Sequence, residues 1–242
     1  MGLTGHCNTL ILAMSFAAPG VVSALLEAGI NVDNSVDRIG NHAFEYAASL
    51  SRVENLRLWM ERIPDWDINR PNTFIGGTVL NLALLMGNGC SSYETAKFLL
   101  DNGLLLEKSV MHGGATALMN AAQNESINPN VLKLILDHGA KLDARKRPQT
   151  LKFKIIKGIM RFILKYRISK SEILRVLTDF HNASAIFMAV ARGDTEVVRL
   201  LLDRGASVHL KNADGDDVIR FCNVRGPFPR IMRLLLKAKE KN

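Results

Sequence analysis

The chain has 242 residues, is 48% hydrophobic and 6% aromatic, and carries a formal net charge of +8. This composition excludes a disordered, low-complexity chain and suits one globular domain or one elongated repeat array. The cysteines Cys7, Cys90 and Cys222 are odd in number, lie far apart and form no CxxC pair, which favours a reducing, cytoplasmic compartment.

The first predicted element is the stretch TLILAMSFAAPGVVSALLEAG, residues 9–29, which is apolar enough to suggest a signal peptide or a membrane span. No basic segment precedes it, and Pro19 and Gly20 interrupt it in the middle. We therefore expect two helices with a turn at Pro19-Gly20, and no transmembrane segment.

Two sequence patterns alternate along the chain, and together they predict a series of helix pairs. The first pattern is short and apolar: TLILAM (9–14), AFEYAA (43–48), TVLNLAL (78–84), TALMNAA (116–122) and SAIFMAV (184–190). The second is an apolar run, a polar pair, usually a glycine, and an alternating tail: VVSALLEAGINVD (21–33), the looser NLRLWMERIPDWDIN (55–69), TAKFLLDNGLLLE (95–107), VLKLILDHGAKLD (131–143) and VVRLLLDRGASVH (197–209). Gly103, Gly139 and Gly205 stand where the second helix must end in a left-handed cap.

These residues resemble the ankyrin repeat, whose TPLHLAA and VVxLLLxxGAxxN patterns are matched most closely by residues 116–143 and 184–209. The resemblance implies an all-α solenoid of stacked helix-turn-helix units with short β-hairpin or loop tips, because one unit cannot bury its own apolar face. We expect a single array over residues 1–242, with a worn last copy. Its repeats lie at about 5–36, 37–69, 70–107, 108–144, 181–210 and 211–242.

The stretch RKRPQTLKFKIIKGIMRFILKYR, residues 145–167, interrupts this pattern. Residues 144–180 hold eleven basic residues against Glu172 and Asp179, so the basic charge of the chain is local. The equivalent apolar doublets before and after the stretch, Ile135-Leu136 and Leu201-Leu202, are 66 residues apart, which is twice a 33-residue repeat. Helices are predicted over 151–166 and 169–177, the second with Ser169 and Glu172 at capping-box spacing. We expect a diverged basic helical unit, 145–180, stacked between repeats four and five through Leu151, Ile155, Ile159, Phe162, Ile163 and Tyr166.

Motifs that carry catalysis are not found in the sequence: there is no P-loop, HExxH, GxSxG or kinase set. The six histidines have no partner at metal-ligand spacing, and the acidic NADGDD run lacks the glutamate of a calcium loop. We therefore expect no enzyme, no cofactor and no metal.

The family resemblance implies a scaffold or adaptor that binds another protein through hairpin tips and the ends of first helices. Trp59 occupies a leucine position and is expected in the core, whereas Trp66 follows Pro64 and is a better candidate for exposure. Most of this surface could equally be plain solvated side chains, and the chain is taken as a monomer. The expected partner-binding residues are Arg52, Trp66, Asn72, Met86, Asn88, Met111, His112, Gln123, Asn124, Arg192, Asp194, Lys211 and Asn212.

The basic unit permits a second interpretation, a polyanion site over residues 145–175. A solvated charged helix face is the plainer alternative. An acidic protein partner is favoured over an anionic membrane because the same apolar residues are needed for stacking, and nucleic acid is less favoured still because no aromatic platform accompanies the charge. The rival to a protein scaffold is thus a peripheral binder of anionic membranes or nucleic acid. Its candidate residues are Arg145, Lys146, Arg147, Lys152, Lys154, Lys157, Arg161 and Lys165.

Overall fold

The computed structural model describes residues 8–38, 40–73, 76–86, 92–148, 151, 154–155, 158–159 and 180–241. The chain divides into two compact units. The first unit comprises Met1–Val110 and Asn124–Gly139, and the second comprises Met111–Gln123 and Ala140–Asn242.

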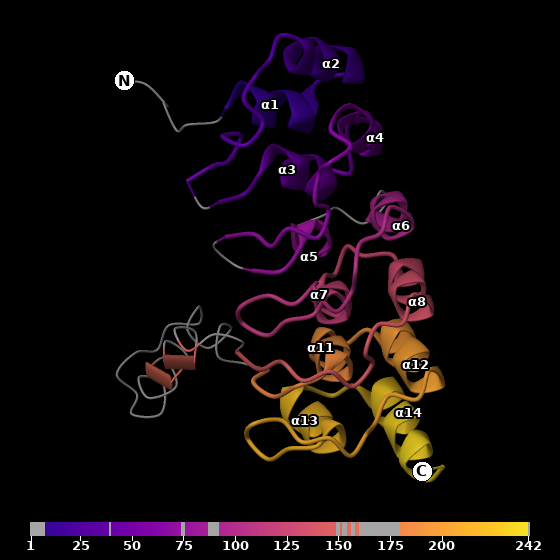
Figure 1. Ribbon diagram of the computed structural model, residues 1–242. Helices are drawn as coiled ribbons and strands as arrows, with labels where there is room; N and C mark the ends of the chain where they lie inside the picture. The colour runs from indigo at the N-terminus through magenta and orange to yellow at the C-terminus, as the bar shows by residue number, and fades with distance from the viewer. Residues whose placement is uncertain are drawn as a thin grey trace, which may run out of the picture. The chain divides into compact units, whose positions relative to one another are not determined.

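The first unit is built from helix pairs. Its helices are α1 (Thr9–Phe16), α2 (Pro19–Glu27), α3 (Ala43–Ser49), α4 (Val53–Arg62), α5 (Val79–Met86), α6 (Ser92–Asp101) and α8 (Pro129–Asp137). The first helices of three pairs, α1, α3 and α5, lie side by side with α3 in the middle, and α4 and α6 follow α2 in a second row (Figure 1). The predicted helix pair at the N-terminus is present, and Pro19 begins its second helix.

The second unit repeats this arrangement with α7 (Ala117–Gln123), α11 (Ala185–Arg192), α12 (Thr195–Asp203), α13 (Val218–Arg225) and α14 (Pro229–Lys239). Helix α11 contacts α7 on one side and α13 on the other, and α12 contacts α14. Because α7 belongs to repeat four and α11 to repeat five, the first helices of these repeats touch directly. The prediction that residues 145–180 form a unit stacked between them is therefore wrong.

The buried residues follow the predicted pattern. The alanine pairs Ala47-Ala48 and Ala121-Ala122 are fully buried in first helices, where their small side chains permit close packing. Trp59 is also fully buried, as expected for its leucine position. Gly103, Gly139 and Gly205 have φ values of 88°, 84° and 87°, the left-handed conformation predicted for helix ends.

The tips between repeats are hydrogen-bonded turns with little strand character. A β-bridge joins Val36 and His42, and the amide of Asp37 donates to the carbonyl of Asn41 at 2.9 Å. The tip at Met111 closes in the same way, through its amide and the carbonyl of Ala115 at 2.9 Å. These turns occupy the positions of the predicted hairpin and loop tips.

The residues on either side of the basic segment are hydrogen-bonded to each other at one tip. The amide of Lys146 donates to the carbonyl of Ala183 at 2.8 Å, and the amide of Asn182 donates to the carbonyl of Lys146 at 2.9 Å. Leu151, 72% exposed, belongs to the face that was predicted to stack. Ile155 and Ile159 are exposed as well, which contradicts their predicted burial. The remaining predicted face and the 169–177 helix with its capping box lie outside the described residues.

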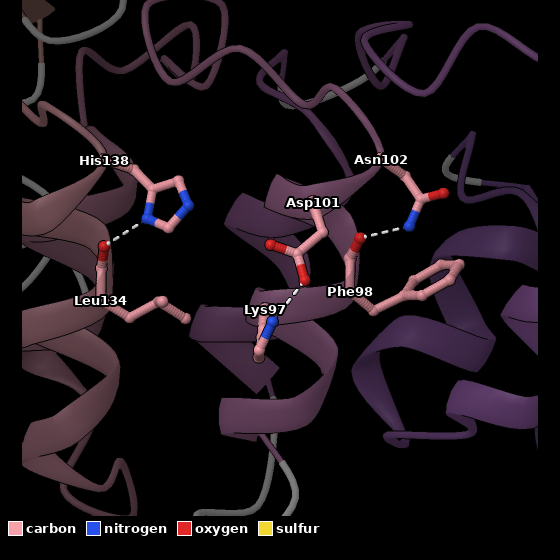
Figure 2. A network of polar contacts seen from close by, with 6 residues as sticks. All are labelled: Lys97, Phe98, Asp101, Asn102, Leu134 and His138. Carbon is pink, nitrogen blue, oxygen red and sulfur yellow. Dashed lines mark hydrogen bonds and ion pairs between the residues drawn. The ribbon is translucent and has the colours of Figure 1, made fainter.

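Several polar side chains on the second helices α6 and α8 form hydrogen bonds within their own helix. Lys97 pairs with Asp101 one turn later on α6, and this hydrogen bond raises the pKa of the lysine (Figure 2). Asn102 donates to a carbonyl of the preceding turn at 2.7 Å, and His138 Nδ1 lies 2.8 Å from the carbonyl of Leu134 on α8 (Figure 2). Such exposed contacts within one helix contribute little to folding.

Candidate functional site

An apolar hollow of about 290 Å³ lies across the first helices α1, α3 and α5 of the first unit. Phe16 is 71% exposed and Met86 is 57% exposed at its edge, where Leu12 and Leu50 are exposed as well. Contiguous exposed apolar surface on a folded protein commonly marks a binding site. The hollow is lined by Ile11, Leu12, Ser15, Phe16, Asn41, Glu45, Tyr46, Ser49, Leu50, Leu82 and Met86.

The local sequence explains why this surface is apolar. Helix α1, TLILAMSF, and helix α5, VLNLALLM, contain no charged residue. Each is apolar around its circumference, so the residues that do not face a neighbouring helix remain exposed as apolar side chains. Ile11 and Leu82, on the buried sides of these helices, form the floor of the hollow.

The hydroxyl and amide side chains in the lining are all occupied within the chain. The hydroxyls of Ser15 and Ser49 donate to carbonyls one turn earlier, at 2.7 Å and 2.9 Å. The Tyr46 hydroxyl donates to Asp37 at 2.7 Å, and the amide of Asn41 donates to the same carboxylate at 3.0 Å. The hollow thus presents apolar groups, with its polar groups already committed to internal bonds.

Glu45 is the charged residue of the lining, and it is almost fully buried. Burial raises the pKa of its carboxyl group, although hydrogen bonds from the His42 amide and from Asn72 act in the opposite direction. The His42 amide lies 2.7 Å from Glu45 Oε2, which closes a capping box at the start of α3. Glu45 therefore holds the fold together and exposes little charge to the hollow.

The structure separates the expected partner-binding residues of the first unit. Met86 alone among them lines the apolar hollow, and Arg52 lines a different, more polar hollow of about 480 Å³. Arg52 donates to the carbonyl of Ala17 at 2.9 Å. Trp66 is half-buried: its ring lies 5.2 Å from the Trp59 ring centre and 4.6 Å from that of His42.

The three asparagines expected to bind a partner in this unit do not form one exposed surface among the described residues. Asn72 was expected at an exposed tip, but it is buried and its amide donates to the carbonyl of Gly40 at 2.9 Å and to Glu45 at 3.1 Å. Asn124 donates to the carbonyl of Leu84 at 2.8 Å and so links two repeats. Asn88 lies outside the described residues.

In the second unit, the expected residues also make internal contacts. Arg192 forms an ion pair with Asp194, the N-cap of α12. Partial burial acts to raise the pKa of Asp194, but the Val197 amide and Arg192 together hold it below its usual range. Asn212, expected at a tip, is buried and accepts hydrogen bonds from two backbone amides. Met111 and His112 are half-buried, and Gln123 and Lys211 are exposed.

The base of the basic segment is a compact cationic cluster in the second unit. Arg145 donates to the carbonyl of Asn182 at 2.6 Å and to that of Lys211, which ties two tips together. Arg147 donates to Asn182 Oδ1 at 2.9 Å, and the Lys146 ammonium lies 5.8 Å from the centre of the Phe180 ring. Partial burial, followed by repulsion from Arg147, lowers the pKa of Arg145.

Of the other polyanion candidates, Lys154 is exposed. Lys152, Lys157, Arg161 and Lys165 lie outside the described residues. The described His, Cys, Asp and Glu residues include no group of three or more that could hold a metal ion. In the same part of the chain, no helix is long and apolar enough to cross a bilayer.

A sequence model of the ankyrin repeat matches residues 113–147 and 181–213. The crystal structure of the ankyrin repeat domain of Bcl-3, titled "a unique member of the IkappaB protein family", superposes with a TM-score of 0.64 and 23% identity, over 94% of this chain and 81% of that one. The resemblance to the ankyrin-repeat family is thereby supported by a sequence model over these two stretches and by the fold over most of the chain. The predicted all-α repeat solenoid is thereby confirmed.

A curated mouse (Mus musculus) relative carries the name "B-cell lymphoma 3 protein homolog" and is 24% identical over 208 residues. The match covers 86% of this chain and 38% of the relative, so the chain spans well under half of that protein. The two ankyrin matches stop at 147 and resume at 181. The hydrogen bond between Asn182 and Lys146 joins the residues that flank this gap.

Sequence reasoning missed several residues of the ankyrin surface. Leu12 and Phe16 were placed in a predicted helix but not among the expected binding residues, although their i, i+4 spacing on a charge-free helix could have indicated a shared face. Phe180 and Asn182, with φ of 63° and 60°, form the return of the basic segment. Positive φ in residues other than glycine is uncommon, and no pattern in the sequence indicated it here.

Proposed function

We propose that this chain is a non-enzymatic scaffold or adaptor that binds another protein through the first-helix face of its ankyrin repeats. The observation that carries this proposal is the exposed apolar hollow on α1, α3 and α5, with Phe16 and Met86 at its edge. Dispersed cysteines support a location inside the cell, in the cytoplasm, and a monomer is the simplest state.

Binding at this face is tested by affinity capture from extracts of the source cells with the native chain and three variants of the whole chain. Phe16→Lys and Met86→Lys place charges in the hollow, whereas Val224→Lys changes an exposed apolar residue elsewhere. We expect proteins captured by the native chain and by Val224→Lys to be lost, by about tenfold or more, from both hollow variants, because large apolar contacts dominate interfaces. Equal capture by all four forms, with unchanged circular dichroism, would exclude this face.

An acidic protein segment at the basic tip is a second proposal, favoured by the clustering of Lys146, Arg147 and Lys211 around Asn182. Arg145 mainly connects two tips there, because its guanidinium donates hydrogen bonds to the carbonyls of Asn182 and Lys211. The residues beyond Pro148 that carry the remaining positive charge, up to about residue 175, would extend the same surface. The rival occupant is an anionic membrane or a nucleic acid.

The basic tip is tested with the triple variant Lys146→Gln, Arg147→Gln and Lys211→Gln, and with the matched control Lys237→Gln, Lys239→Gln and Lys241→Gln. Both remove three positive charges. For a poly-glutamate peptide, we expect about tenfold weaker binding by the tip variant alone, and a steep loss for the native chain as salt rises, because exposed charges are screened. Equal weakening in both triple variants would indicate net charge only. Tighter binding of phosphatidylserine vesicles or single-stranded DNA than of the peptide would favour the rival.

A further inference from the structure

We propose that Arg147 is the residue of the basic tip that recognises a single carboxylate of the acidic partner, and that Gly114 positions it. This inference rests on the acidic-segment proposal above and specifies which cation of the tip determines specificity. Three observations lead to it: a close backbone contact between Gly114 and Arg147, a guanidinium plane fixed by hydrogen bonds, and repulsion between two neighbouring arginines.

The backbone of Arg147 lies directly against Gly114, in the tip of repeat four. Gly114 has a φ of 84°, a left-handed conformation that other residues rarely adopt. A Cβ atom at this position would overlap the backbone nitrogen, carbonyl carbon and carbonyl oxygen of Arg147. Any side chain at position 114 would therefore displace Arg147, so the glycine is required for the place that Arg147 occupies.

Hydrogen bonds fix both the backbone and the side chain at this place. The amide of Lys146 donates to the carbonyl of Ala183 at 2.8 Å, and the carbonyl of Lys146 accepts from the amide of Asn182 at 2.9 Å. Arg147 Nε donates to Asn182 Oδ1 at 2.9 Å, and Asn182 Nδ2 donates to the carbonyl of Lys211 at 3.2 Å. The Asn182 side chain is thus bonded at both ends, and it orients the plane of the Arg147 guanidinium before any partner binds.

A guanidinium held in this way can recognise the shape of an anion as well as its charge. The group has five N–H donors in one plane, and its two terminal nitrogens form a fork that matches the two oxygens of a carboxylate. Asn182 accepts from Nε, and Arg147 is exposed, so an acidic side chain can approach it from solvent. A lysine ammonium at the same place would supply equal charge without this paired geometry.

Repulsion between neighbouring guanidinium groups also favours an anion at Arg147. Partial burial, followed by repulsion from Arg147, lowers the pKa of Arg145. Arg145 donates to the carbonyls of Asn182 and Lys211, so it cannot move away without breaking these hydrogen bonds. A carboxylate bound by Arg147 would relieve this repulsion. Lys211 is exposed and has a flexible stem, so it adds charge to the tip without a fixed geometry.

The inference is tested with two charge-preserving variants of the whole chain, Arg147→Lys and Gly114→Ala, each titrated with a poly-glutamate peptide. We expect both to bind the peptide about tenfold more weakly than the native chain, because one charge-assisted hydrogen bond is lost or displaced. The salt dependence of binding should stay the same as in the native chain, because the number of positive charges is unchanged.

Each variant has a matched control. Lys211→Arg exchanges one cation for another at the same tip and keeps the backbone carbonyl that Asn182 and Arg145 use. Gly205→Ala imposes the same left-handed strain, at a φ of 87°, where an added Cβ would meet no atom within 4 Å. Both controls should bind the peptide within about twofold of the native chain. Urea unfolding identifies any variant that fails to fold, and if Gly114→Ala does so, Arg147→Lys decides alone.

Equal binding of the peptide by Arg147→Lys and by the native chain would overturn the inference, since the tip would then recognise charge alone. The acidic-segment proposal stands after that result if the triple variant Lys146→Gln, Arg147→Gln and Lys211→Gln still loses the peptide. Both proposals fail if the native chain does not bind the peptide or if the triple variant binds it equally well. A larger effect of Arg147→Lys on single-stranded DNA or phosphatidylserine vesicles than on the peptide would assign Arg147 to a nucleic acid or a membrane, and would also overturn the inference.

Discussion

Replacement of His42 by threonine is expected to remove most of the acid sensitivity of this fold between pH 6.5 and 4. His42 begins α3 at the position that Thr78 and Thr116 occupy before α5 and α7. Its imidazole is buried against Trp59 and Trp66, and burial lowers its pKa to about 4. The folded state therefore holds this histidine neutral at pH values where the unfolded chain would bind a proton.

The geometry explains the preference for the neutral ring. His42 Nδ1 accepts a hydrogen bond from the amide of Phe44 at 3.2 Å, and Nε2 lies 2.8 Å from the carbonyl of Val32. These contacts fit one tautomer, with the proton on Nε2. A second proton on Nδ1 would face the Phe44 amide and break the cap of α3.

The sign of the effect follows from proton binding in the two states. Between pH 6.5 and 4 the unfolded state binds more protons at His42, so the free energy of unfolding falls as pH is lowered through this window. The span from 6.5 to about 4 corresponds to about 3 kcal/mol. Glu45 acts in the opposite direction, because its raised pKa makes the folded state the better proton binder above its ordinary value. Proton binding by Glu45 therefore offsets part of the decrease in the free energy of unfolding that His42 causes in the native chain.

The measurement is urea unfolding of the native chain and of His42→Thr at intervals from pH 7.5 to 4. The free energy of unfolding of the native chain should decrease as pH is lowered. That of His42→Thr should stay constant or increase slightly, because Glu45 still favours the folded state at low pH. His138→Gln is the matched control, since His138 is exposed at the end of α8. It should decline like the native chain. Parallel declines in native and His42→Thr proteins would show that the acid sensitivity arises elsewhere.

Local chemistry in the sequence was sufficient to predict the helix pairs. The glycine caps and the core position of Trp59 depend on the pattern within one repeat, and the structure confirms both. Which tip asparagine is buried depends on bonds between repeats. Asn72 reaches Gly40 and Glu45, about one repeat earlier, and no spacing within its own repeat indicates this contact.

Two further predictions failed, the stacking of the basic segment and the assignment of the exposed apolar surface, because the sequence pattern does not determine either. The 66-residue step equals two repeats in length, but length does not specify which first helices touch on either side of it. The contact of α7 with α11 decides it. The apolar hollow was missed because helix α1 is apolar on every side, so hydrophobic periodicity gives no indication of which side remains uncovered.

Asn55→Ala is expected to lower the free energy of unfolding by about 2 kcal/mol, because it leaves a buried carbonyl without its donor. Asn55 is buried in α4, and its amide lies 3.1 Å from both Met14 O and Ala17 O at the end of α1. Arg52 also donates to Ala17 O and keeps that carbonyl occupied in the variant. The carbonyl of Met14 is therefore the group that loses its hydrogen-bond donor in the variant. Asn55→Asp should destabilise the fold further, since a carboxylate would face two carbonyl oxygens.

Hydrogen exchange in each helix distinguishes loss of the Asn55 hydrogen bonds between α4 and α1 from a general loss of packing. Each repeat in a solenoid depends mainly on its neighbours, and Asn55 joins repeat two to repeat one. Hydrogen exchange of Asn55→Ala should therefore accelerate first in α1 and α2, the end pair, before it accelerates in α5 and α6. Asn102→Ala is the control, because that exposed amide donates within its own helix, and it should change the free energy of unfolding by less than about 0.5 kcal/mol. Uniformly faster exchange in all helices of the first unit, or equal losses for the two variants, would contradict a clamp between the first two repeats.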